Sequence, residues 1–333
     1  MVLDDLDVPV ILAPLAGGPS TPELAAAVSD AGGLGFLGAG YLTADALRER
    51  IAATRALTSR PIAVNLFVIN GSPADPATYA SYVESLKPEA ERLGVAVGEP
   101  RFDDDELDAK LGVLLEDPVA VVSFTFGLPR ADLLERLRAA GTEIWATVTN
   151  PDEAAEAAQA GPDVIVAQGG EAGGHRGSFD DAGDQPVVRL RELLAGVRAR
   201  TDLPLVAAGG IAAADDVAAA RSAGAAAVAA GTAFMLTPEA GTADAHRDAI
   251  ASDTPTALTR AFTGKLARGI RNRFMDEHPD APRAYPEIHY ATAPIRAAAR
   301  KLGDAGVINL WAGEAHALAE ARPAAEIARE LGR

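Results

Sequence analysis

Short apolar runs recur along the first two thirds of the chain, and each is followed by an amphipathic stretch rich in Ala and Leu. Runs that are apolar throughout, without alternation, are typical of strands buried on both faces of a parallel sheet. Their alternation with helical stretches predicts a parallel α/β fold. The runs span residues 10–14, 34–37, 61–67, 120–126, 143–148, 163–167, 203–207 and 225–229.

Helix signals stand between these runs. Thr21 and Thr43 are placed to cap the starts of two helices, and Asn150 precedes a proline at the start of another. Eight strand–helix units in about 235 residues match the size of a closed (β/α)8 barrel, the TIM barrel. The pattern leaves an open doubly wound sheet as the alternative. Glycines stand where helices should end, at positions 32, 141, 161 and 224.

Two segments are longer than a minimal barrel needs. Residues 69–118 form an insertion after the third strand, with a predicted helix over 76–93 and an acidic loop over 103–106. We expect residues 1–235 to form the barrel and residues 236–333 to form an extension, a small domain or lid, that packs over the barrel mouth. Long connections at the C-terminal face of a barrel are where pockets and lids are built.

The formal net charge of −17 argues against nucleic acid and against an anionic membrane surface as partners. The chain has no cysteine, which excludes a disulfide framework, a thiol nucleophile and a thiolate metal site. Its start carries Asp4, Asp5 and Asp7 in place of a basic leader, and no apolar stretch reaches the roughly 20 residues that span a bilayer. We expect a soluble cytoplasmic protein, a monomer or homodimer, that acts on a small molecule.

The C-terminal ends of the predicted strands carry glycines, neutral amides and one imidazole, at the place where barrel enzymes do their chemistry. They lack the paired carboxylates of a glycosidase and the His, Asp and Glu cluster of a catalytic metal, so no metal site is predicted. The candidate site residues are Ala13, Pro14, Leu15, Ala16, Asn65, Gln168, Gly173, Gly174, His175, Gly209, Gly210, Gly231 and Thr232.

Two glycine turns follow the seventh and eighth runs, Gly209-Gly210 and Gly231-Thr232. Glycine lets backbone N–H groups approach a phosphate closely, and a following helix adds its positive end. In barrels these two loops are a frequent phosphate site. Each turn alone is explained as a tight turn, but the pair at these two strands favours a phosphate site.

The segment 168–177 follows the sixth run and holds five glycines in ten residues, so a flat ring could lie against its backbone. His175 projects from this loop and is the only one of the five histidines at a strand end. Histidine titrates near neutral pH and can therefore serve as a general base without a large pKa shift. We interpret His175 as the catalytic residue.

The segment 260–273 (RAFTGKLARGIRNR) carries five basic residues and no acidic one, within a strongly acidic chain. It is interpreted either as a solvated helix face or as a contact to an anion, the cofactor phosphate or a charged substrate.

Six motifs occur in the order seen in the nitronate monooxygenase (2-nitropropane dioxygenase) family, which the chain resembles over nearly its whole length. The EAGGH block is quite specific, although flavin-dependent enoyl-ACP reductases share it. The motifs are APLAG at 13–17, NLF at 65–67, QGGEAGGHRGSF at 168–179, AAGGI at 207–211, AGT at 230–232 and TGKLARGIRN at 263–272.

The resemblance implies a barrel that holds non-covalent FMN at its C-terminal mouth. It places the 13–16 backbone, Asn65 and Gln168 on the flavin ring or ribityl chain, and His175 on the substrate side. It also implies that segments 263–272 and 311–313 help to enclose the pocket. Leu15 departs from the family, where methionine is common, and we expect the backbone contacts there to tolerate it. The phosphate end would be held by Gly174, Gly209, Gly210, Gly231 and Thr232.

The implied reaction is oxidative denitrification of alkyl nitronates, and of nitroalkanes, with O2 to a carbonyl compound and nitrite. His175 would deprotonate a neutral nitroalkane or hydrogen-bond the oxygens of the nitronate. The alternative is an NAD(P)H-dependent FMN reductase of the enoyl-ACP or quinone reductase type, although no G-x-G-x-x-G lies between a strand and a helix. A third interpretation is a phosphate-binding barrel without redox chemistry.

Overall fold

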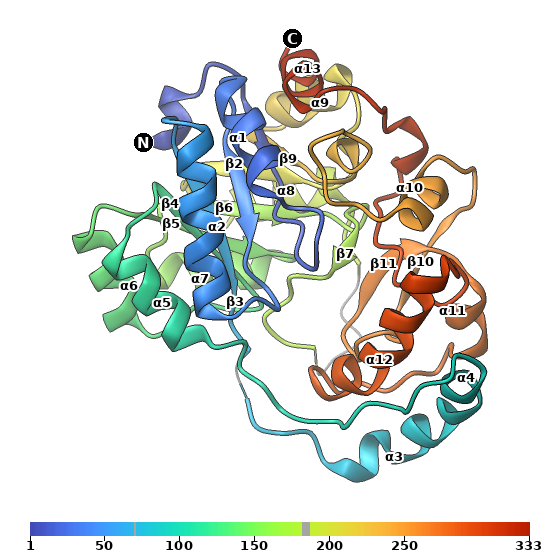
Figure 1. Cartoon of the computed structure of the whole chain (residues 1–333). Helices are drawn as coiled ribbons and strands as arrows, with labels where there is room; N and C mark the ends of the chain where they lie inside the picture. The colour runs from blue at the N-terminus through green and yellow to red at the C-terminus, as the bar shows by residue number, and fades with distance from the viewer. Residues whose placement is uncertain (70, 182–186) are drawn as a thin grey trace.

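The computed structural model describes residues 1–69, 71–181 and 187–333, and its centre is a barrel of eight parallel strands (Figure 1). The strands pair in the order β1-β9-β8-β6-β5-β4-β3-β2, and the Leu12 N–H donates to the Leu34 carbonyl at 2.9 Å, which joins β1 to the β2 end. The predicted (β/α)8 barrel is confirmed and the open sheet is wrong. The strands are β1 (Val10–Leu12), β2 (Gly35–Gly38), β3 (Ile62–Phe67), β4 (Val121–Thr125), β5 (Glu143–Val148), β6 (Val164–Gln168), β8 (Leu205–Ala208) and β9 (Ala227–Ala230).

Helices cover the outside of the barrel, as the amphipathic stretches predict. The side chains of Thr21, Thr43 and Asn150 accept backbone N–H groups at the starts of α1, α2 and α7, so the three predicted caps are confirmed. The covering helices are α1 (Pro22–Asp30), α2 (Ala44–Leu57), α5 (Leu107–Glu116), α6 (Ala131–Ala139), α7 (Pro151–Ala160), α8 (Leu190–Arg198) and α9 (Ala214–Ser222).

The barrel interior is filled at its N-terminal end and open at its C-terminal end. Phe36 and Trp145 pack inside the barrel with ring centroids 5.8 Å apart, beside Ile11. Further along the strands the inward positions are small, including Ala13 and Ala229, and they line a cavity. Strand sequence therefore decides where the barrel has room for a ligand, because bulky and small residues occupy different layers.

The insertion and the C-terminal extension share a second hydrophobic core that contains Tyr82, Leu86, Phe262, Phe274 and Ile288. In Figure 1 α3 and α4 accordingly lie beside α11 and α12, away from the strands that precede them in sequence. The elements are α3 (Pro76–Ser85), α4 (Lys87–Arg92), α10 (Asp244–Ile250), β10 (Thr256–Thr259), β11 (Ala267–Ile270), α11 (Arg273–Glu277), α12 (Glu287–Leu302) and α13 (Ala324–Leu331).

The single helix predicted over 76–93 is wrong, because α3 ends before Leu86 and α4 starts at Lys87. Pro88 lies in the first turn of α4, where its missing N–H costs nothing, whereas a continuous helix would need that N–H. Residue 70 of the predicted insertion lies outside the described residues. The proposed division at residue 235 stays a prediction, and α13 packs back on α1 and α9 of the barrel.

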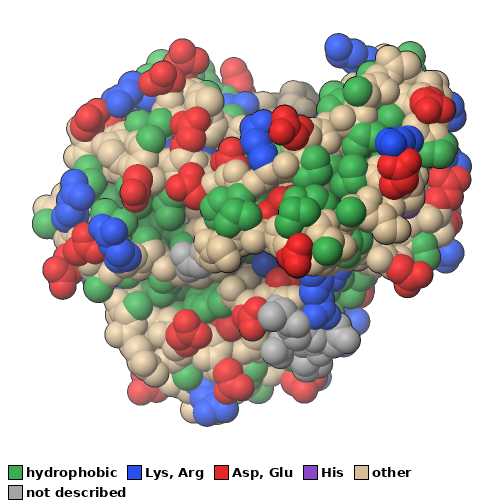
Figure 2. Space-filling model, turned by 90° about the horizontal axis from the view of Figure 1, so that it is seen from below, with side chains coloured by type: hydrophobic (Ala, Val, Ile, Leu, Met, Phe, Trp, Pro, Cys, Tyr) green, Lys and Arg blue, Asp and Glu red, His purple; other side chains and the backbone are tan. Residues whose placement is uncertain are grey.

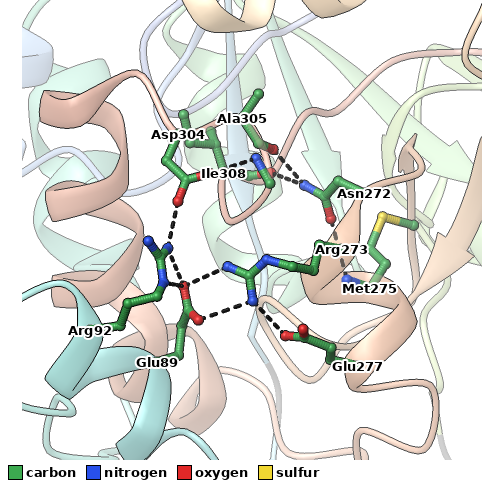
Figure 3. A network of polar contacts seen from close by, with 10 residues as sticks. Glu89, Arg92, Asn272, Arg273, Met275, Glu277, Asp304, Ala305 and Ile308 are labelled. Atoms are coloured by element: carbon green, nitrogen blue, oxygen red, sulfur yellow. Dashed lines mark hydrogen bonds and ion pairs between the residues drawn. The ribbon is translucent and has the colours of Figure 1, made fainter.

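A charged network joins the insertion to the extension (Figure 3). Glu89 of α4 accepts hydrogen bonds from Arg92 of its own helix and from Arg273 of α11, at 2.6 and 2.9 Å. Arg92 also pairs with Asp304, and Arg273 with Glu277. Glu89 is buried while its partners reach the surface, so one carboxylate links two segments distant in sequence.

A three-stranded antiparallel sheet ties the glycine-rich loop to the extension. Residues Gly174–His175 form β7 and pair with β11, with His175 opposite Ala267, and β11 pairs on its other side with β10. The prediction of a helix over 260–273 is therefore wrong. The reason is tertiary, since β11 obtains its ladder from two segments that local sequence does not bring together.

Candidate active site

A cavity of about 650 Å³ lies at the C-terminal ends of the barrel strands, a size typical of small-molecule sites. Residues of the extension, among them Thr263 and Trp311, form part of its wall. The structure brings all the candidate site residues into this one cavity. They are Ala13, Pro14, Leu15, Ala16, Asn65, Gln168, Gly173, Gly174, His175, Gly209, Gly210, Gly231 and Thr232.

The two glycine turns lie side by side, because β8 and β9 are paired neighbours. Gly209 and Gly210 have φ values of 114° and 71°, which glycine adopts without strain. A Cβ on Gly209 would stand 3.0 Å from the backbone N of Ala172, so a larger residue would crowd the loop that faces it. Gly231 begins the short 3-10 helix η2 (Thr232–Phe234), and the Thr232 hydroxyl accepts the Gly313 N–H at 3.0 Å.

Two amide side chains of the cavity wall are held by hydrogen bonds. Asn65, in the C-terminal half of β3, donates to the hydroxyls of Ser123 and Thr125 at 2.8 and 2.9 Å. Gln168 at the end of β6 donates to the His175 carbonyl and accepts the Gly177 N–H, at 3.0 and 2.8 Å. Gln168 therefore holds both ends of the short segment that carries His175.

Buried guanidinium groups donate hydrogen bonds to backbone carbonyls of the glycine-rich loop, residues 168–177. Arg176 donates to the carbonyls of Gly169 and Gln168 at 2.7 and 3.0 Å, and Arg268 donates to that of Gly170 at 2.8 Å. Charge-assisted bonds of this kind are stronger than neutral ones. A loop with little side-chain bulk is thus kept in one shape.

The basic residues of segment 260–273 are occupied within the protein. Arg260 pairs with Asp181 at 2.5 Å, Arg268 with Glu314 at 3.1 Å, and the Lys265 ammonium lies over the Phe126 ring, 4.5 Å from its centroid. Arg271 pairs with Asp276, and Arg273 pairs with both Glu89 and Glu277. Among the described residues that line the cavity none of these five appears. Neither predicted role, solvated helix face or anion contact, describes the segment.

His175 stands on the cavity wall among aromatic rings, with centroids 6.0 Å from Phe126, 5.7 Å from Tyr285 and 5.5 Å from Trp311. Its Nε2 lies 2.9 Å from the Thr263 hydroxyl. Burial, followed by the positive charges of Lys265 and Arg296, lowers the pKa of His175 to about 3. The imidazole is therefore neutral near pH 7.

One face of α12 was not anticipated from the sequence. His289, Ala293, Arg296, Ala297 and Arg300 all line the cavity, at spacings that place them on one side of a helix. This periodicity is visible in the sequence, but alanines and arginines are equally typical of a solvated face. Tyr41, after β2, joins this wall, since its ring stacks on His289 at 4.2 Å and its hydroxyl lies 3.3 Å from that of Tyr285.

The cavity has the opposite electrostatic character to the chain as a whole. Of the described residues that line it, none is Asp or Glu, whereas Arg296 and Arg300 are present. On the outer face shown in Figure 2, in contrast, acidic and basic side chains are interspersed. A protein with net charge −17 thus encloses a site suited to anions.

The family model described as nitronate monooxygenase matches residues 3–333. The chain belongs to the nitronate monooxygenase family. It is 42% identical to the nitronate monooxygenase of Paraburkholderia phytofirmans, over 98% of this chain and 92% of that protein. A member of this family is an enzyme, and the strand-end residues described above form its candidate active site.

Solved structures of related proteins share the fold of this nitronate monooxygenase family member. Nitroalkane oxidase from Streptomyces ansochromogenes superposes with a TM-score of 0.97 at 46% identity, over 99% of this chain and 96% of that one. FabK from Thermotoga maritima is less similar, with a TM-score of 0.73 at 27% identity over 99% and 94%. Within the described residues, no helix has the length and apolar character that a membrane crossing requires.

Proposed function

We propose that this enzyme holds FMN in the cavity and oxidises alkyl nitronates with O2, which yields a carbonyl compound and nitrite. Family membership and the likeness to a nitroalkane oxidase support the reaction class. The observation that carries the proposal is the cavity itself. Adjacent glycine turns, the His175 loop and an arginine-bearing helix surround it, and no Asp or Glu of the described residues lines it.

The residues present fit a flavin mononucleotide. The turns at Gly209-Gly210 and Gly231-Thr232 offer backbone N–H groups with little side-chain bulk, as a phosphate requires. The 13–16 backbone, Asn65 and Gln168 lie along the cavity wall, where they would contact the ring and ribityl chain. When bound, FMN supplies the redox chemistry, and the protein supplies binding, orientation and electrostatics.

His175 would act on the substrate as a hydrogen-bonding group. A base with a pKa of about 3 accepts a proton poorly near pH 7, so removal of a proton from a neutral nitroalkane is disfavoured. A neutral imidazole can still donate one hydrogen bond to a nitronate oxygen. Phe126, Tyr285 and Trp311 around the ring limit the access of water.

The test is an absorption spectrum followed by an oxygen-electrode assay. The purified protein should be yellow, release FMN on denaturation, consume O2 with ethyl nitronate and form nitrite. A colourless protein that FMN does not reconstitute would reject the cofactor. A yellow protein without nitronate turnover would reject the reaction and leave the cofactor standing.

The likeness to FabK favours one second candidate, an NAD(P)H-dependent flavin reductase on the same barrel. Mixing the protein with NADH or NADPH without air separates the two. Rapid bleaching of the flavin would support the reductase, and a flavin that bleaches only with nitronate supports the oxidase.

A further inference from the structure

Among the described residues that line the cavity, Arg296 is the buried cation, with 5% of its surface exposed. Its guanidinium donates to the His289 carbonyl at 2.8 Å and to the Thr292 hydroxyl at 3.0 Å, and it lies 3.2 Å from His289 Nδ1. A longer contact of 3.4 Å reaches the Asn309 side-chain oxygen. These partners fix the position of the group, and all of them are neutral.

The charge of Arg296 has no counter-ion among the described residues. Buried Lys110 and Arg268 are different, since they pair with Asp105 and Glu314 at 2.7 and 3.1 Å. Arg300 adds a second positive charge and shares the Asn309 oxygen at 2.6 Å. Burial, and then the charge of Arg300, lowers the pKa of Arg296 to about 10, which leaves it charged at neutral pH. A buried charge of this kind is costly unless something compensates it.

A chain of contacts connects Arg296 with His175. The His289 ring beside the guanidinium stacks on Tyr41, whose hydroxyl lies 3.3 Å from that of Tyr285. The Tyr285 ring in turn contacts the His175 ring at 5.7 Å. The charge of Arg296 is close enough to contribute to the lowered pKa of His175. Arg296 therefore belongs to the His175 side of the cavity.

The flavin phosphate is not the anion that Arg296 would meet. The glycine turns that fit the phosphate follow β8 and β9. In the barrel order, β3 and β4 lie across from those strands, where Phe67 ends β3 and Phe126 follows β4. The Tyr41 ring packs on Phe67 at 5.6 Å, so the Arg296 group lies over the far side of the barrel.

We propose that Arg296 is the specificity residue that binds the negative charge of the substrate, so that the site takes the nitronate anion in preference to its neutral parent nitroalkane. The proposal rests on the proposed function. It adds that the substrate binds as an anion and that Arg296 is the residue that binds its charge. An anion beside the guanidinium supplies the missing counter-charge, whereas a neutral nitro group leaves it uncompensated.

Wild-type holoenzyme allows a test that needs no variant. Nitrate is a planar anion with the geometry of a nitronate head, and nitromethane carries a neutral nitro group of similar shape. Nitrate should compete with ethyl nitronate at least about tenfold more strongly than nitromethane, the order expected for a charged hydrogen bond. Equal inhibition by the two compounds would overturn the proposal.

The variant Arg296→Met should raise the inhibition constant of nitrate about 10- to 100-fold and that of nitromethane less than about threefold. Arg296→Lys should recover part of the loss, because it keeps the charge without the planar fork. Arg191→Met, which removes an exposed charge on α8, is the control and should change neither constant. Equal losses for both inhibitors in Arg296→Met, or no loss for nitrate, would contradict the role.

Binding can be read without turnover from the shift in the flavin spectrum when nitrate is added. If nitronate is not oxidised and nitrate still perturbs the wild-type spectrum but not that of Arg296→Met, the anion site stands and the proposed reaction fails. If nitronate is oxidised and nitrate binds both proteins alike, the reaction stands and the role of Arg296 fails.

Discussion

The ammonium of Lys110 lies 2.7 Å from the carboxylate of Asp105, at a position where the lysine side chain has no exposed surface. The same carboxylate accepts the Tyr41 N–H at 2.8 Å, and Lys110 donates to the Ala39 carbonyl at 3.0 Å. Tyr41 has a φ of 68°, a strained value for a residue with a side chain. The acidic loop of the insertion thus holds a cavity-lining residue through a buried ion pair.

Asp105→Asn should lower the free energy of unfolding by about 3 to 5 kcal/mol, because it leaves the Lys110 ammonium buried without a partner. Lys110→Met should cost less, since burial already raises the pKa of Asp105 to about 6 and a proton can neutralise it. Lys110 lowers that pKa in the wild-type protein, so the variant should hold it higher still, and its stability should fall as the pH rises from 5 to 8. Urea unfolding at pH 5 and pH 8 measures both. A double variant less stable than Asp105→Asn would contradict the pairing.

Gly210→Ala should weaken FMN binding at least about tenfold, because the residue adopts a φ of 71° in the turn that fits the phosphate and a Cβ would stand 3.3 Å from Glu171. Gly94→Ala is the matched control. Gly94 has a φ of 68° and open space around a Cβ, so it reports backbone strain alone. Flavin fluorescence titration of both apoproteins gives the two dissociation constants. Equal weakening in both variants would attribute the effect to strain.

Glu89→Gln should destabilise the protein by about 1 to 2 kcal/mol, because it removes the charge that Arg92 and Arg273 contact from partly exposed positions (Figure 3). Burial raises the pKa of Glu89, but hydrogen bonds from both arginines outweigh it and lower the pKa to about 2. The stabilisation is therefore present above about pH 4.5 and lost as the pH falls toward 2. Thermal unfolding between pH 3 and 7 should show the two proteins converge in acid.

The barrel could be predicted from the sequence because its signals are local. Each strand is a continuous apolar run, and caps such as Thr21 and Asn150 act within one turn of their helix. The strand β11 could not be predicted in this way. It forms because β7 and β10 supply its partners, and the charges of Arg268 and Arg271 suggested a surface helix in place of a buried ladder.

Some residues of the candidate site could likewise be predicted from local sequence, and others could not. Residues at strand ends, such as Asn65 and His175, can be placed from sequence, since the fold brings all C-terminal strand ends to one face. Arg296 and Tyr41 could not be placed in the site from sequence, because their positions depend on how the extension and the insertion pack over the barrel. From sequence alone His175 is expected to have the ordinary pKa of histidine, and burial in the folded cavity lowers that pKa.

The neutral state of His175 leads to a pH prediction. Burial, then the charges of Lys265 and Arg296, holds the pKa of His175 near 3, so the folded enzyme keeps a neutral imidazole from pH 5 to 8. The kcat/KM for preformed nitronate, measured by rapid mixing, should therefore not change through ionisation of this group across that window. The neutral fraction of an unshifted histidine would instead fall about fivefold between pH 6.5 and 5.5. A break near pH 6.5 that His175→Asn abolishes would contradict the low pKa.

Thr263 should set which ring nitrogen of His175 carries the proton, since its hydroxyl lies 2.9 Å from Nε2. Thr263→Val removes that partner and should lower kcat/KM for ethyl nitronate about tenfold, the cost of one misdirected hydrogen bond. Thr263→Ser keeps the hydroxyl and should lose less than about threefold. The flavin content should stay unchanged, because Thr263 contacts the imidazole and neither glycine turn. The thermal midpoint of Thr263→Val should fall slightly, since the buried hydroxyl also donates to the Lys265 carbonyl at 3.3 Å. Equal losses in Val and Ser would assign Thr263 a packing role, and the tautomer of His175 would then depend on other groups.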